Sequence, residues 1–170
     1  MPMREFLDRV KAHFGYLFDD YGFTIEIQEC YKMFGNCLVI LGAGDCRIAI
    51  EKDRSQILVD IVSPLSREEK FPLTSIVGFI TRLDSKPYDP SEGGRELYSE
   101  IIGEAEQWVR LGSLLKQHCQ AILKLFQRDV FEQEQELLRE YIRRVTREYV
   151  QRIAGCPKPG GGMSAGSALG

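Results

Sequence analysis

The sequence predicts an α+β fold: a helix, a four-stranded antiparallel meander, a second helix, and then a long C-terminal helical region. Three observations lead to this prediction. Residues 3–21 repeat apolar side chains at helical spacing, residues 23–62 show the pattern of short strands and turns, and residues 95–154 lack proline. A helical stripe recurs every three or four residues, whereas a half-buried strand alternates every two. The first part of the chain therefore has the predicted order αββββα.

The first helix is expected over residues 3–21. Its apolar positions form one stripe, which contains Phe6, Leu7, Val10, Phe14, Leu17, Phe18 and Tyr21. A surface helix buries such a stripe against a core. Gly22 follows directly and suits the left-handed conformation that often ends a helix.

Four strands are expected between residues 23 and 62. Apolar and polar residues alternate over residues 23–28 and 46–51, which is the period of a half-buried strand. Turn-forming residues separate the strands at positions 35–36, 42–45 and 53–55. Residues 37–41 and 57–62 are apolar almost throughout. We therefore expect both faces of the sheet to be covered, the second one by helices that follow residue 95.

The rest of the chain is predicted to be helical. A helix is expected over residues 73–84 and a linker over residues 86–94. One continuous helix over residues 95–154 would extend about 90 Å, so breaks are expected near Gly103, Gly112 and residues 127–129.

Three segments follow from this pattern. We expect an α+β domain over residues 1–88, and a helical region over residues 95–154 that packs partly on the sheet and partly projects. Residues 155–170 have the composition of a disordered glycine-rich tail.

Composition limits the functions that are open to the chain. The net charge of -3 provides no global basic field for nucleic acid or an anionic membrane. No apolar run approaches the roughly 20 residues that span a bilayer, and the N-terminus does not resemble a signal peptide. The five cysteines lack a CxxC pair, which predicts reduced thiols in a cytoplasmic protein. A disulfide between Cys30 and Cys37, across a hairpin, is the less favoured alternative.

No pattern predicts a catalytic, cofactor or metal site, and the chain is not expected to be an enzyme. The two histidines, His13 and His118, lie in different predicted helices, without cysteine or histidine at ligand spacing. Cys119 follows His118, but neighbouring helical residues point about 100° apart. Residues 42–44 lack the lysine of a phosphate-binding loop.

Asp60 interrupts an otherwise apolar strand. A half-buried carboxylate needs a partner. We expect Arg54 or Arg47 to form a structural ion pair with Asp60, and acid–base chemistry is the less supported alternative.

The candidate interaction residues lie in the C-terminal helical region, where an acidic segment (127–136) precedes a basic one (137–154). Leu138, Ile142, Val145 and Tyr149 form an apolar seam at coiled-coil spacing, and Arg139, Arg143 and Arg147 form a row beside it. Three interpretations are open: a solvated helix face, pairing with a second helix, or contact with phosphate. In an antiparallel pair the acidic and basic segments would meet, so we expect a homo-oligomer or an equivalent pairing with a partner helix.

Two short motifs resemble a group of small bacterial proteins. They are Leu17-Phe18-Asp19-Asp20-Tyr21-Gly22-Phe23 and Asp53-Arg54-Ser55-Gln56-Ile57-Leu58-Val59-Asp60-Ile61. The group shares a leading helix that ends in an aromatic-Gly-Phe turn and a meander with an Asp-Arg turn, and some members resemble immunity proteins of toxin–immunity pairs. The resemblance is limited to residues 1–85. It implies a bacterial protein that binds another protein, and it implies no catalytic residue.

The favoured function is therefore a non-enzymatic protein-binding module of a bacterial operon, of immunity type or an assembly subunit. The alternative is an oligomeric scaffold subunit that contacts nucleic acid or another anionic surface through the arginine row, and salt-sensitive retention on nucleic acid would favour it. Nucleic acid is the less favoured partner because no aromatic residues interleave with the row. A membrane is not expected as a partner.

Overall fold

The computed structural model describes residues 1–31, 36–81 and 103–155. In these ranges the chain forms the helices α1 (Met3–Asp19), α2 (Leu73–Thr81), α4 (Glu104–Leu125) and α5 (Arg128–Gly155). The strands are β1 (Thr24–Tyr31), β2 (Asn36–Ala43), β3 (Cys46–Asp53), β4 (Gln56–Val62) and β5 (Lys70–Pro72). The α+β class is confirmed, with one strand more than predicted. The predicted linker and the glycine-rich tail lie outside the described residues.

The five strands form an antiparallel meander in the order β1-β2-β3-β4-β5. Gly44 adopts a φ of 57° in the turn between β2 and β3, where glycine carries no steric penalty. The additional strand, β5, lies in a segment that the sequence predicts as a polar loop. It is short and contains Pro72, and it pairs only with residues 60–62 of β4. Phe71 points from β5 into the core and is 4% exposed.

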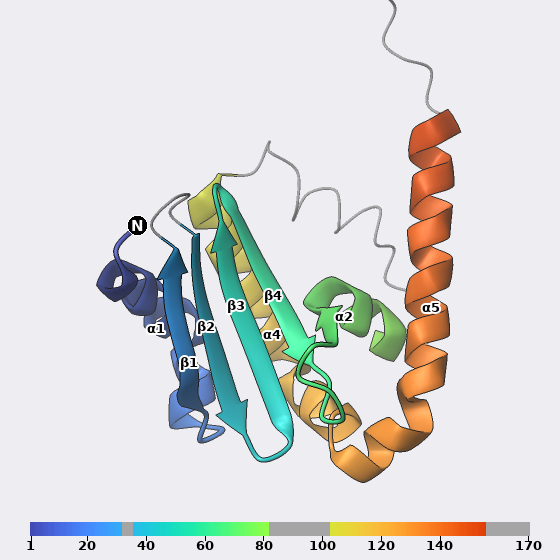
Figure 1. The fold of residues 1–170 in the computed structure, drawn as a ribbon, viewed down its shortest axis with the longest axis horizontal. Coiled ribbons are helices and arrows are strands. Elements are labelled where there is room, and N and C mark those ends of the chain that lie inside the picture. The colour runs from blue at the N-terminus through green and yellow to red at the C-terminus, as the bar shows by residue number, and fades with distance from the viewer. Residues whose placement is uncertain (32–35, 82–102, 156–170) are drawn as a thin grey trace, which may run out of the picture.

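The helices cover one face of the sheet. In Figure 1, α1 and α4 lie behind the strands, and α2 packs among β4, α4 and α5. The strand residues on this face are buried, and they include Val39, Leu41, Ile48, Ile50, Ile57, Val59 and Ile61. The prediction that later helices cover the second face is wrong for the described residues, because α4 packs on the same face as α1.

Trp108 of α4 lies at the centre of the helical layer. Its side chain is fully buried, and its ring centroid lies 5.6 Å from that of Phe6 and 6.2 Å from that of Phe14 in α1. Gly112, one turn further on, lies inside α4 and does not break it. A Cβ at this position would lie 2.7 Å from the His13 carbonyl oxygen. The glycine therefore permits the close approach of α4 to α1, and the helix break predicted at Gly112 is wrong.

The first turn of α4 is fastened to the hairpin of β3 and β4. Lys52 of β3 forms an ion pair with Glu104. Gln107 accepts a hydrogen bond from the Ile57 backbone N–H (2.9 Å) and donates one to the Ser55 carbonyl oxygen (3.0 Å). Since β5 pairs only with the last residues of β4, Gln107 satisfies a buried strand edge that no other described strand covers.

Two of the cysteines form a disulfide. Cys30 and Cys37 lie directly opposite each other in β1 and β2, with Cα atoms 4.1 Å apart, and their sulfur atoms are bonded. The prediction that all cysteines are reduced is wrong for this pair, because the strand register brings the two side chains together. Cys46 and Cys119 are free and buried. Because these two cysteines are oxidised, they no longer support the cytoplasmic location that was predicted from reduced thiols.

Reduction of the disulfide should lower the free energy of unfolding by about 2–3 kcal/mol, since a short cross-link limits the unfolded chain. Chemical denaturation with and without reductant measures this change. The double variant Cys30→Ser, Cys37→Ser is the control and should not respond to reductant. Alkylation of unfolded, unreduced protein at Cys30 and Cys37 would show that the disulfide does not form.

Replacing Gln107 by alanine should destabilise the fold by about 1–3 kcal/mol, because the buried Ile57 N–H loses its acceptor. Urea denaturation measures the change. Gln117→Ala is the matched control, since Gln117 is exposed on the same helix. Equal midpoints for the two variants would contradict the role assigned to Gln107.

Candidate functional site

The first half of α5 is anchored in the core. Phe131 and Leu138 are fully buried and Tyr141 is 5% exposed. The ring of Tyr141 packs edge-on against Phe79 of α2, with centroids 5.8 Å apart. The helix is therefore held firmly at its base. In Figure 1 its later turns extend beyond α2.

Arg139 reinforces this anchor. Its Nε and Nη2 atoms donate to the two carboxylate oxygens of Glu69, in the loop before β5, at 2.7 and 2.9 Å. Its Nη1 atom donates to Glu136 at 2.6 Å. Such a bidentate ion pair is among the stronger ionic contacts in proteins. The Arg139 guanidinium lowers the pKa of Glu69. The sequence predicts Arg139 as an interaction residue, but the structure engages it within the chain.

The predicted apolar seam is also directed inward in part. Leu138 lies in the core and is not available to a second helix, while Ile142 and Val145 are half-buried against the same core. The side chain of Tyr149 lies outside the described part of the chain. The seam between Leu138 and Val145 thus faces this chain's own body, because α2 occupies the position that the sequence pattern assigns to a partner.

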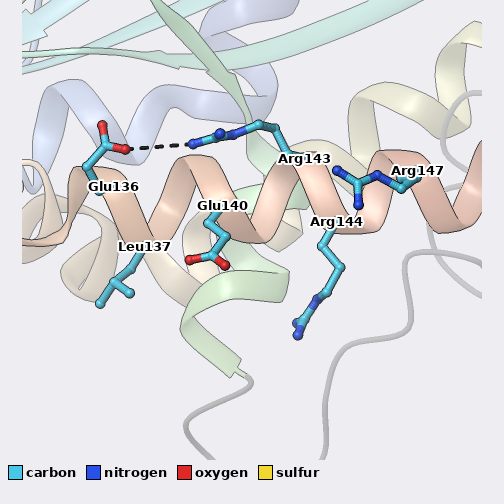
Figure 2. Close-up of a pocket in the computed structure, with 6 residues that line it drawn as sticks. All are labelled: Glu136, Leu137, Glu140, Arg143, Arg144 and Arg147. Carbon is cyan, nitrogen blue, oxygen red and sulfur yellow. Dashed lines mark ion pairs between the residues drawn. The ribbon is translucent and has the colours of Figure 1, made fainter.

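The remaining arginines stay at the surface. Figure 2 shows Arg143, Arg144 and Arg147 around a shallow hollow on α5 that Glu136, Leu137 and Glu140 complete. The Arg143 side chain is 64% exposed, and its Nη2 atom lies 3.7 Å from the Glu136 carboxylate. We call Arg143, Arg144 and Arg147 the α5 arginine face.

Two contributions to this surface are not evident from the sequence pattern. Arg144 lies over the ring of Tyr141, 5.6 Å from its centroid, so this face includes an arginine outside the predicted row. Leu137 and Val150 are 49% and 57% exposed, which adds apolar area on either side of the arginines. The spacing of Tyr141 and Arg144, three residues apart on a helix, is the only sequence signal for the first contact.

A second candidate surface lies on the side of the sheet that faces away from the helices. The strand register aligns Ile27, Ile40, Ala49 and Asp60 across β1 to β4, and Leu38, Glu51 and Leu58 across β2 to β4. Residues directly opposite in antiparallel strands project on the same side of the sheet. We call these seven residues the open sheet face. Its aliphatic residues are half-buried, apart from Ala49, which neighbouring side chains cover.

A β-bulge shapes the edge of this surface. The register of β1 shifts between Ile25 and Ile27, which puts the two isoleucines on opposite sides of the sheet. The Glu26 side chain crosses Gly42, where a Cβ would collide with its carboxylate, and pairs with Arg47 at 2.8 Å. A bulge of this kind is not visible in the alternating sequence pattern.

Asp60 lies among the aliphatic residues of the open sheet face. Arg47 pairs with Glu26, and Arg54 is exposed in the turn between β3 and β4 without contacting Asp60, so the predicted ion pair of Asp60 with either arginine is wrong. Within the described residues no basic side chain forms an ion pair with Asp60. Burial raises the pKa of Asp60, and the charge of Lys70 opposes this effect. A partly desolvated carboxylate thus remains on a largely aliphatic surface.

The described residues show no arrangement suited to nucleophilic or metal chemistry. Burial raises the pKa of Cys46 to about 12 and that of Cys119 to about 11, so neither thiol ionises near neutral pH. His13 stacks on Trp108 at 5.8 Å. No group of three potential metal ligands occurs in the described ranges.

No family model, no curated protein and no solved structure matches this chain. In the ranges that the structure describes, no helix combines the length and apolar character needed to cross a membrane.

Replacing Asp60 by asparagine should raise the free energy of unfolding at pH 7. The raised pKa of Asp60 means that its charged form is disfavoured in the folded state. This penalty is complete above the folded-state pKa and disappears below the unfolded value of about 3.9. Urea denaturation of dilute, monomeric protein should therefore show a stabilised variant at pH 7 and a shrinking difference towards pH 3.5. Asp8→Asn, on the exposed side of α1, is the control and should change little. A destabilised Asp60→Asn variant at pH 7 would contradict this assignment.

Proposed function

We propose that this protein is a non-enzymatic protein-binding module, an immunity-type or assembly subunit of a bacterial operon, and that its partner binds the α5 arginine face. The anchored helix with exposed arginines is the observation that supports the proposal. Leu138, Tyr141 and the ion pair of Arg139 hold the base of α5. A helix held in this way presents its later turns with little loss of conformational entropy on binding.

The chemistry of the α5 arginine face suits an acidic protein surface. Arginine is enriched in protein interfaces, where its planar group can form two hydrogen bonds to a carboxylate. Leu137 and Val150 add apolar area beside the charges. Glu136 and Glu140 lie within the same hollow and would repel a phosphate backbone. These features favour a protein partner over nucleic acid.

The positions of the histidines and the state of the buried thiols favour binding over catalysis. The histidines lie in separate helices, α1 and α4, and the buried thiols of Cys46 and Cys119 have raised pKa values. The bacterial context and the immunity or assembly type come from the resemblance of residues 1–85. They remain part of the proposal.

A photo-reactive amino acid at position 147 should form a covalent product with a protein partner in cells of the source organism. The same probe at Arg9, which is exposed on α1, is the control and should not give that product. The variant Arg143→Glu, Arg147→Glu should reduce capture by a probe at position 137 by about tenfold or more. Arg4→Glu, Arg9→Glu is the matched charge control and should have no such effect.

Two outcomes would contradict the proposal. A product that nuclease removes would identify nucleic acid as the partner and support the scaffold alternative. The absence of any product that depends on the position of the probe would show that the α5 arginine face binds no macromolecule in the cell.

A further inference from the structure

The chain carries two exposed surfaces of opposite charge. The open sheet face has an aliphatic centre with Glu51 and Asp60, and Glu29 projects beside Leu38 on the same side. Glu26 and Arg47 neutralise each other. The second half of α5 carries Arg143, Arg144 and Arg147 at the surface, whereas Arg139 is engaged by Glu69 and Glu136. One molecule therefore contains both an acidic, partly apolar surface and a basic helix.

We infer that the open sheet face binds the second half of α5 from a second copy of this chain. The inference rests on the proposed function, because it names the partner of the α5 arginine face. It also supplies the covering layer that an aliphatic sheet face lacks. In the described residues all helices that contact the sheet pack on its other side.

The dimensions of the two surfaces agree. A helix rises 1.5 Å for each residue, so the exposed side of α5 over residues 137–151 extends about 22 Å. A strand of eight residues, such as β2 or β3, spans about 26 Å. The exposed side of α5 can therefore cover most of the length of the central strands.

The side chains on α5 are spaced for this contact. Arg143, Arg147 and Val150 follow one another at intervals of four and three residues, which places them on one side of the helix. An arginine from this stripe can pair with Asp60, whose carboxylate has no ion pair in the described residues, and Val150 can contact the neighbouring leucines. Pairing a desolvated carboxylate at the centre of an interface favours specificity as well as affinity.

Two molecules can satisfy this contact reciprocally. If each α5 crosses to the sheet of the other molecule, the contact occurs twice and the assembly closes as a dimer with two-fold symmetry. A contact made in one direction only would continue into a chain of molecules. We expect the closed dimer, because the reciprocal contact leaves neither surface exposed.

Charge reversal on each surface tests the inference with purified, full-length protein. The sheet variant carries Glu29→Lys and Glu51→Lys, and the helix variant carries Arg143→Glu and Arg147→Glu. Sedimentation velocity up to about 100 µM should show a wild-type dimer, and each variant alone should dissociate at least about tenfold more readily. An equimolar mixture of the two variants should form a dimer again, because each altered surface then meets one of opposite charge.

A further variant separates folding from association. Asp60→Asn should stabilise the monomer, measured in dilute protein where the dimer is dissociated, yet weaken the dimer, and a merely structural role would not produce these opposite effects. Circular dichroism melts establish that each variant folds.

The inference fails if wild type is monomeric, or if the mixed variants do not associate. The cross-link at position 147 then decides the wider question. A product with another protein would leave the proposed function intact, whereas the absence of a product would remove both.

Discussion

The packing of α4 against both α1 and the sheet is the constraint on which the rest of the structure depends. Trp108 contacts the aromatic side chains of α1, and Gly112 allows the two helices to approach closely. Gln107 binds the uncovered edge of β4. One helix thus buries the apolar stripe of α1 and satisfies the backbone of the sheet. This position of α4 also sets where α2 and α5 can lie.

This arrangement divides the surface of the molecule. Among the described residues, the helices that contact the sheet gather on one side, and most aliphatic residues on the other side are half-buried. Half-buried aliphatic residues with a partly desolvated carboxylate, Asp60, form a surface that gains from a covering layer. The anchoring of α5 has the opposite consequence, because it directs an apolar seam inward and leaves charged residues outside. Both surfaces are products of the same packing.

The division of roles among the arginines follows from position on the helix. Arg139 lies beside the buried stripe and can reach Glu69 of the loop before β5. Arg143 and Arg147 lie one and two turns further on, and successive positions four residues apart rotate away from the buried side of α5, so their side chains are exposed. Residues that look equivalent in the sequence therefore differ in function, since one stabilises the attachment of α5 and the others are available for binding.

The sequence by itself determined the elements that depend on local spacing. The stripe of α1, the glycine turns, the alternating strands of the meander and the basic end of α5 all follow from periodicity and composition. Only the tertiary structure decided which surfaces these elements bury. The Cys30–Cys37 bond depends on strand register, and the placement of Glu26 depends on a bulge. The role of Gly112 depends on a helix contact, and the burial of Leu138 depends on the position of α2. Each of these involves residues distant in the sequence or a backbone irregularity, neither of which leaves a local signal.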